Sequence, residues 1–235
     1  VDFRRPPALI RPTASLFIHR GGNLEWWAAF LRHHVVASST NHLRFHWVQH
    51  TAERDRVDDS PRLIIVGGPN GAGKTTIALE YAKERQLPYL GADAIAVAFS
   101  PDNPSAARIP AARQFIEEFG QYVSARTSFV CESTLSGVTM RNFIASARGA
   151  GYVVSTVFVF VESAEICVAR VVERARKGGH DVPAPDIRRR FGRSVRNFWG
   201  IYRRLSDHWV LTYNGATTLQ DVAAGARDQT VIRDS

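Results

Sequence analysis

The stretch LIIVGGPNGAGKTT, Leu63 to Thr76, joins an apolar run, a glycine-rich turn and the start of a helical segment. Within it, GPNGAGKT (Gly68 to Thr75) fits the pattern G-x-x-x-x-G-K-[ST] at every position. Glycines let the backbone wrap around a phosphate chain so that several N–H groups point inward, and the following helix presents its positive end. A strand before the pattern and a helix after it are the required context, so this stretch predicts nucleotide binding.

Two polar side chains at the end of this loop, which we call the P-loop, have separate expected roles. Lys74 can reach the outer phosphates, and the Thr75 hydroxyl can ligate Mg²⁺. A glycine-rich turn that only connects a strand to a helix would not need both residues. The predicted nucleotide-binding residues are Gly68, Pro69, Asn70, Gly71, Ala72, Gly73, Lys74, Thr75 and Thr76.

Downstream of Pro61, apolar runs typical of buried strands alternate with helical segments. The expected strands are 63–67, a short run ending at Asp93, 128–132, 153–161 and 208–214. The expected helices are 74–85, 110–126, 139–148, 163–177 and 186–205. This alternation predicts an α/β fold with a parallel sheet flanked by helices on both faces. Ligands bind beyond the carboxyl ends of such strands, where we expect Gly68, Asp93 and Glu132.

Other features of composition set the limits of the domain. Residues 1–60 hold six of the eight histidines without metal-site spacing and show no sustained periodicity, so we expect a poorly ordered N-terminal extension before a catalytic domain at 61–235. Cys131 and Cys167 are far apart and lie in apolar surroundings, which favours buried thiols in a reducing cytoplasm. No run approaches the roughly 20 apolar residues of a membrane span.

Positive charge is concentrated in one part of the chain. The formal net charge is +8, and residues 170–204 alone hold ten arginines and one lysine against three acids. This stretch includes GGHDVPAPDIRRRF (178–191), in which glycines permit a hinge and prolines stiffen the segment before three arginines. We therefore predict a mobile arginine-rich helical lid, about 174–193, that closes over a transferred phosphoryl group. The alternative is a solvated helix face.

The class of P-loop protein follows from what the sequence lacks. It has no N-K-x-D signature for guanine, which argues against a GTPase, and no long apolar strand ending in Asp of the kind found in motor ATPases. The remaining class is the small-molecule kinases, and we expect ATP and Mg²⁺ as cofactors.

From about Arg62 to Gly215 the chain resembles the zeta-toxin family of P-loop kinases. The matching pieces are IIVGGPNGAGKTT, GADAIA, FVCESTLSG and RVVERARKGGHDVPAPDIRRRFGRSVRNF. Near the end, YNG stands where the family tends toward Y-D-N-S, which leaves a role for Asn214 open. Residues 1–60 are not covered by the resemblance.

The resemblance implies transfer of the ATP γ-phosphate to a sugar hydroxyl of UDP-N-acetylglucosamine or a related nucleotide sugar. A protein of this family would act as the toxin of a toxin–antitoxin system or as a metabolic regulator, with an antitoxin protein as a candidate partner. Asp93, at the end of a strand and within reach of the P-loop, is suited to be the general base.

Further site residues rest on the resemblance. It implies that Glu132, with Ser133 and Thr134, contacts the acceptor, and that Arg113 holds the acceptor's phosphates. Arg174 and one arginine of the 188–190 run would be the lid arginines. The catalytic set expected from motif and resemblance together is Asp93, Lys74, Arg174 and Arg190, the last chosen because Phe191 follows it.

Two alternative functions stay open at the level of sequence. A P-loop kinase of another small alcohol, such as an antibiotic or a metabolite, would use the same nucleotide site. A nucleic-acid-binding protein would use the basic helix 186–204, whose aromatic residues are more typical of a core. Because the charge is confined to one element, we expect a small-molecule acceptor and no nucleic-acid or membrane partner.

Overall fold

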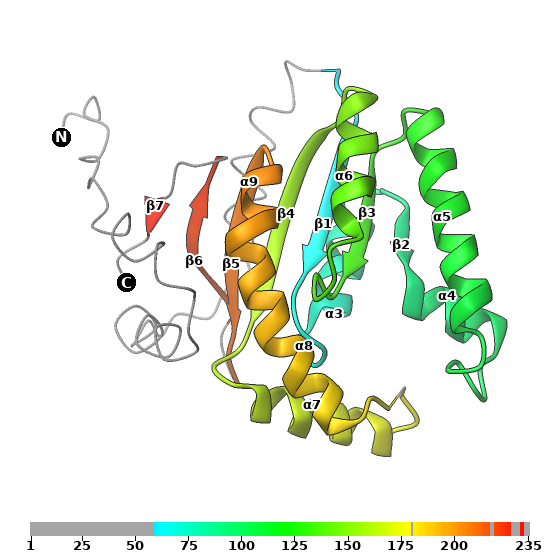
Figure 1. The fold of residues 1–235 in the computed structure, drawn as a ribbon, viewed down its shortest axis with the longest axis vertical. Coiled ribbons are helices and arrows are strands. Elements are labelled where there is room, and N and C mark those ends of the chain that lie inside the picture. The colour runs from blue at the N-terminus through cyan, green and yellow to red at the C-terminus, as the bar shows by residue number, and fades with distance from the viewer. Residues whose placement is uncertain (1–58, 180, 217–218, 227–230, 233–235) are drawn as a thin grey trace.

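The computed structural model describes residues 59–179, 181–216, 219–226 and 231–232 (Figure 1). The expected extension at 1–60 therefore lies, except for its last two residues, outside the described residues.

Strands and helices alternate along most of the described chain (Figure 1). The strands are β1 (Arg62–Gly67), β2 (Tyr89–Gly91), β3 (Phe129–Ser133), β4 (Val153–Phe160), β5 (His208–Asn214), β6 (Leu219–Gly225) and β7 (Val231–Ile232). The helices are α3 (Lys74–Arg85), α4 (Ala92–Phe99), α5 (Arg108–Ser124), α6 (Met140–Gly149), α7 (Ala164–Arg176), α8 (Ala184–Asn197), the π-helical turn η2 (Phe198–Tyr202) and α9 (Arg203–Leu205).

The seven described strands form one sheet in the order β2-β3-β1-β4-β5-β6-β7. Strands β1 to β5 are parallel to their neighbours, and β6 and β7 add an antiparallel edge. The predicted parallel α/β sheet is confirmed. The antiparallel edge was missed, because LQDVAAG in β6 lacks the dense β-branched or aromatic run that indicates a strand.

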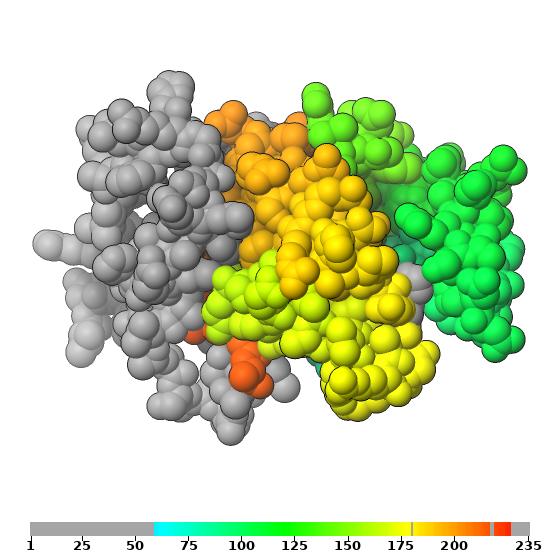
Figure 2. Space-filling model, turned by 60° about the horizontal axis from the view of Figure 1, so that its bottom comes forward, coloured from blue at the N-terminus to red at the C-terminus, as the bar shows by residue number. Residues whose placement is uncertain are grey.

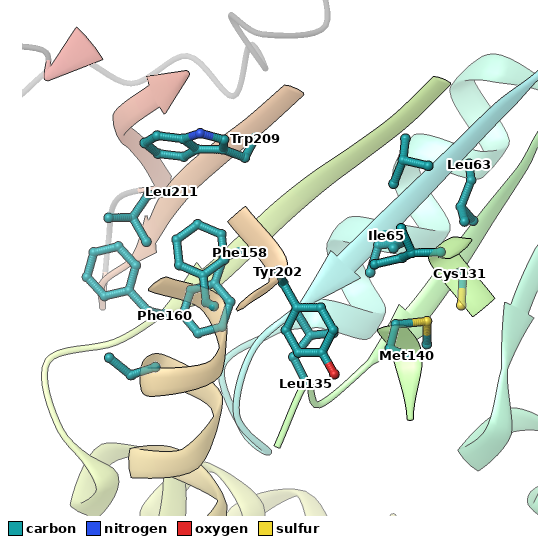
Figure 3. Packing of buried hydrophobic residues seen from close by; sticks show 14 of the residues in the cluster. Leu63, Ile65, Cys131, Leu135, Met140, Phe158, Phe160, Tyr202, Trp209 and Leu211 are labelled. Atoms are coloured by element: carbon teal, nitrogen blue, oxygen red, sulfur yellow. The ribbon is translucent and has the colours of Figure 1, made fainter. Parts of the chain in front are cut away.

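Alternate side chains of the central strand β1 face opposite layers of helices. Leu63 and Ile65 belong to the larger core cluster, which also includes residues of α5, α6 and α8 (Figure 3). Ile64 and Val66 pack on the other face with residues of α3 such as Ile77. Both faces of the sheet are therefore covered, as the near-continuous apolar strands predict.

One predicted boundary was wrong at a position that matters for the site. The second strand ends at Gly91, and Asp93 lies in the first turn of α4 instead of at a strand end. The segment ADAIAVAF is rich in alanine, which favours a helix. A carboxylate in the first turn of a helix is also stabilised by the helix dipole. Asp93 nonetheless stays at the carboxyl edge of the sheet, because β2 ends only two residues earlier.

The aromatic residues of the basic helix belong to the core. Phe191, Phe198 and Tyr202 are at most 3% exposed, and the Phe198 ring stacks on Phe158 with 4.5 Å between centroids. These three rings cannot stack on bases, and Trp199, the fourth aromatic of this segment, is partly buried against the same core. Within the described residues, no helix is both long enough and apolar enough to span a bilayer.

We predict that Phe198→Ala destabilises the domain by about 3–5 kcal/mol, because it removes a fully buried ring from the core. Urea unfolding followed by fluorescence measures this change. The matched control is Phe99→Ala, which truncates a ring that is 54% exposed and should cost less than about 1 kcal/mol. Equal losses in the two variants would contradict the described packing of η2.

Candidate active site

The P-loop and its neighbouring helices surround a cavity of about 290 Å³ at the carboxyl ends of the parallel strands. Figure 2 shows this end of the molecule, where the surface is hollowed between α8 and the α4–α5 side. The cavity is lined by Asn70, Gly71, Gly73, Lys74, Thr75, Thr76, Asp93, Glu132, Arg170, Val171, Arg174 and Asn214.

Two glycines let the P-loop backbone approach its neighbours closely. A Cβ on Gly68, whose φ is 141°, would lie 2.1 Å from the carbonyl oxygen of Val159. A Cβ on Gly71, whose φ is 80°, would lie 2.5 Å from the carbonyl oxygen of Cys167. Both positions combine a left-handed backbone with contact to another backbone, so no other residue fits without displacing β4 or α7.

Lys74 is held at the floor of the cavity. Its Nζ donates to the carbonyl of Pro69 at 3.0 Å and lies 3.6 Å from Oε1 of Glu132. The Lys74 and Glu132 side chains are only 6% and 11% exposed, so each charge is compensated by the other in a poorly hydrated place. Tyr89 donates to the second oxygen of Glu132 at 2.6 Å. Burial and the Glu132 carboxylate raise the pKa of Tyr89 above its usual range, which keeps its hydroxyl a donor.

Oxygen-bearing side chains suited to Mg²⁺ line the same cavity. Thr75 is exposed at the start of α3, and the Asp93 and Glu132 carboxylates share the cavity wall with it. Among the described residues, no three His, Cys, Asp or Glu side chains are grouped as a metal site. This donor set fits a magnesium ion held by one or two protein oxygens together with substrate phosphates.

The three consecutive arginines of α8 point to different partners. Arg188 makes a two-pronged ion pair with Glu165, with both N···O distances 2.9 Å. Arg189 pairs with Asp186 at 2.8 Å on its own helix. Arg190 instead donates from Nη1 to Oδ1 of Asn70 in the P-loop at 3.3 Å. Of the three, Arg190 is therefore the one that reaches the nucleotide site, a distinction that the spacing RRR could not make.

Helix α7 contributes two arginines to the wall of the larger cavity. Arg174, predicted from the lid pattern, is exposed and lines the cavity. Arg170, which the sequence analysis did not single out, lines it too and donates from Nη2 to the carbonyls of Asn214 and Gly215 at 3.1 and 3.0 Å. Arg170 lies four residues before Arg174, and residues four apart share one face of a helix, so this spacing could have identified Arg170 as a second arginine of the site.

Asn214, whose role the sequence left open, supports the P-loop directly. Its Nδ2 donates to the carbonyl of Ala72 at 2.8 Å. Gly73 has a φ of 94°, and a Cβ built on it would lie 2.2 Å from the Nδ2 of Asn214. The end of β5 therefore holds the last turn of the loop in place before α3 begins.

A smaller cavity of about 100 Å³ adjoins the first. It is lined by Asn70, Asp93, Ala96, Pro104, Ser105, Arg108, Asp181, Val182, Pro183, Asp186 and Arg190. Asn70 and Asp93 line both cavities, so the two spaces meet at these side chains. One wall comes from α4 and the start of α5, and the other from the segment that begins α8.

The remaining predicted residues lie at the margin of these cavities. Arg113 is exposed on α5 and lines neither cavity. The Ser133 hydroxyl accepts a hydrogen bond from the backbone N–H of Leu135 at 3.2 Å, and Thr134 Oγ1 lies 2.9 Å from the Ser136 hydroxyl. These two side chains therefore stabilise the turn after β3. His180 lies outside the described residues.

We expect Asn214→Ala to weaken binding of Mg-ATP about threefold to tenfold, because the Ala72 carbonyl loses its hydrogen bond and the P-loop becomes less ordered. Isothermal titration calorimetry measures the affinity. The control is Asn142→Ala on the exposed face of α6, which should leave it unchanged. An Asn214 variant with wild-type affinity would show that this bond is not needed to form the site.

Comparison with known proteins supports the architecture. An uncharacterized protein of Haemophilus influenzae is 29% identical over 130 residues, which are 55% of this chain and 92% of that protein. The structure of the PezAT chromosomal toxin–antitoxin system of Streptococcus pneumoniae superposes with a TM-score of 0.55 at 16% identity, covering 77% of this chain and 83% of that chain. The AvrRxo1-ORF1:AvrRxo1-ORF2 complex with ATP gives 0.58 at 15% identity, over 79% and 64%.

At these identities the two solved structures show the fold alone. The family comparison is more direct, because the model of the AAA domain matches residues 63–195 of the 235-residue chain. The match spans the P-loop, Asp93, Glu132 and most of α8. The chain therefore belongs to this family of AAA domains.

Proposed function

We propose that the protein is an ATP-dependent small-molecule kinase that transfers a phosphoryl group between its two adjoining cavities. The observation that carries this proposal is that the cavities meet at Asn70 and Asp93. The larger cavity contains the P-loop and suits the donor nucleotide. The smaller one would take the acceptor. A carboxylate at the boundary between donor and acceptor is where a kinase needs its general base.

On the donor side, the P-loop amides and Lys74 would hold the phosphates. Lys74 is already turned into the cavity by the Pro69 carbonyl and Glu132, so little rearrangement is needed for it to bind a phosphate oxygen. Thr75 would ligate Mg²⁺, which neutralises charge on the phosphate oxygens when it is bound.

On the acceptor side, Asp93 would take the proton of the attacking hydroxyl. The acceptor oxygen then forms a bond to the γ-phosphorus, the bond from that phosphorus to the β–γ bridging oxygen breaks, and ADP leaves. Because Asp93 is exposed within both cavities, its carboxylate is available to a hydroxyl that enters from the smaller one.

Arg190 and Arg174 would stabilise the negative charge that develops during transfer. Arg190 comes from α8 and reaches Asn70, and Arg174 comes from α7 and lines the larger cavity. Guanidinium groups placed around a transferring phosphoryl group act mainly in the transition state, where the charge is most dispersed. We propose that the lid, about 174–193, carries both arginines, with Arg174 before its glycines and Arg190 after its prolines.

For the acceptor, we propose a sugar hydroxyl of UDP-N-acetylglucosamine or a related nucleotide sugar. The support is the resemblance of FVCESTLSG and of the arginine segment to the zeta-toxin family, together with Glu132 lining the donor cavity near Asp93. On the same grounds we propose a role as the toxin of a toxin–antitoxin system, with an antitoxin protein as partner.

One observation favours a second candidate, a kinase of another small alcohol. Arg113, which by resemblance would hold the acceptor's phosphates, lies outside both cavities, whereas Arg108 lines the smaller one. With Arg108 in place of Arg113 at the smaller cavity, the site would fit an acceptor whose anionic group lies near Arg108, or an acceptor with a single anionic group.

A panel of acceptors distinguishes the two candidates. We expect mass spectrometry to show a gain of one phosphoryl group on UDP-N-acetylglucosamine after incubation with Mg-ATP and the protein. Other nucleotide sugars, free sugars and hydroxyl-bearing antibiotics complete the panel. A gain confined to a compound without a nucleotide would replace the nucleotide sugar by the second candidate. No gain on any compound, with no consumption of ATP, would contradict a kinase.

Two substitutions separate donor binding from transfer. Lys74→Ala should abolish ATP consumption, because the outer phosphates lose their buried cation. Asp93→Asn should lower kcat at least about 100-fold while leaving ATP affinity within about twofold, because it removes the proton acceptor but keeps a side-chain oxygen in the cavity. Calorimetry gives the affinity and a coupled assay gives kcat. Unimpaired transfer by the Asp93 variant would remove our assignment of the base.

A further inference from the structure

Two segments far apart in the chain are hydrogen-bonded to each other: the loop 134–137 that follows β3, and the helix α8 with its turn η2. Ser194 is fully buried, and its Oγ donates to the carbonyl of Thr134 at 2.5 Å. Asn197 Nδ2 donates to two further carbonyls of the loop, at 2.9 and 3.2 Å. Three loop carbonyls, those of Thr134, Leu135 and Gly137, thus accept hydrogen bonds from side chains of one helix.

The π-helical turn adds a third donor to this contact. The Tyr202 hydroxyl donates at 2.6 Å to the carbonyl of Gly137, which also accepts from Asn197. In a regular α-helix, residues five apart point about 140° away from each other. A π-turn, with its i→i+5 hydrogen bond, brings them to the same side. Burial raises the pKa of Tyr202 to about 12, so the hydroxyl stays protonated and able to donate at working pH.

The loop is itself packed against the base of the P-loop. Leu135 is only 1% exposed and has a left-handed backbone with φ 53°. A Cβ on Gly67, the residue directly before the P-loop, would lie 2.2 Å from Leu135 Cδ1. Figure 3 shows Leu135 and Tyr202 within the core cluster. The loop 134–137 is therefore a fixed bridge from the end of β1 to α8.

The anchored face of α8 is also the face that reaches the nucleotide site. Arg190 precedes Ser194 by four residues, so the two side chains lie on one side of the helix, one turn apart. Arg190 contacts Asn70, at the point where the two cavities meet. The position of this guanidinium over the P-loop is thus determined by the hydrogen bonds one and two turns further along the helix.

We propose that Ser194, Asn197 and Tyr202 are positioning residues for phosphoryl transfer, because they dock α8 onto the loop 134–137 and so place Arg190 over the P-loop. The inference rests on the proposed kinase function. It also predicts that α8 stays in place, and that the backbone around Gly178, which has φ 85° and is exposed, changes as the lid closes.

A double-mutant cycle tests whether Asn197 acts through Arg190. Asn197→Ala should lower kcat about fivefold to tenfold, because two hydrogen bonds are lost, with KM for ATP changed less than about twofold. In an Arg190→Ala background the same substitution should have no further effect on kcat. Rates are measured as ATP consumption with UDP-N-acetylglucosamine, or with the acceptor that the panel identifies. Equal losses in the two backgrounds would overturn the proposal.

Two further variants serve as controls for the double-mutant cycle. Tyr202→Phe retains the buried ring and removes only the hydroxyl, so the variant should fold and show a smaller fall in kcat that also vanishes in the Arg190→Ala background. Arg196→Ala changes an exposed residue of α8 next to Asn197 and should leave kcat unchanged. A fall in the Arg196 variant as large as in Asn197→Ala would indicate a general disturbance of the helix and overturn the assignment.

Hydrogen exchange tests the docking of α8 onto the loop 134–137, which we call the anchor, separately from the kinase proposal. If the wild-type protein consumes no ATP with any acceptor, the proposed function is wrong, but the anchor can still be measured. Backbone amides of 187–192 should exchange several-fold faster in Asn197→Ala than in the wild type, because the helix is released from the loop. Unchanged exchange rates would show that these hydrogen bonds do not hold α8 in place, which would overturn the proposal independently of activity.

Discussion

The close contact between the P-loop backbone and its two neighbouring backbones is the constraint on which the rest of the site depends. Gly68 lies directly against a carbonyl of β4, and Gly71 against a carbonyl of α7. Because no Cβ fits at either place, the loop is packed from both sides and its amides are held ready for an anion. The cavity, the position of Lys74 and the approach of Arg170 and Arg174 all follow from this packing.

The three consecutive arginines of α8 have different partners, which the net charge of the segment does not indicate. Arg188 and Arg189 are paired with nearby carboxylates, and only Arg190 of the three points to the P-loop. Exposed ion pairs of this kind contribute little to stability, but they orient the helix surface and leave Arg190 available for a phosphate. Within the run 188–190, one cation is therefore directed at the P-loop and its two neighbours are compensated by carboxylates.

Helix α8 serves the core and the site together. Its aromatic residues and those of η2 fill the space over the sheet, while Ser194 and Asn197 bind the loop after β3. A helix fixed in this way cannot swing as a rigid flap without breaking buried hydrogen bonds and exposing Phe198.

Local sequence was sufficient for the P-loop, for α3 and for the parallel strands, because each depends on neighbouring residues and on the period of apolar side chains. It also predicted that Asp93 and Glu132 lie at the same edge of the sheet. The choice of Arg190 rested in the sequence only on the Phe191 that follows it, and the tertiary structure alone gave its partner, added Arg170 and Asn214 to the site and joined the loop 134–137 to α8. Those contacts link residues about 40 to 140 positions apart, and no local pattern determines which side chains meet when the strands are brought together.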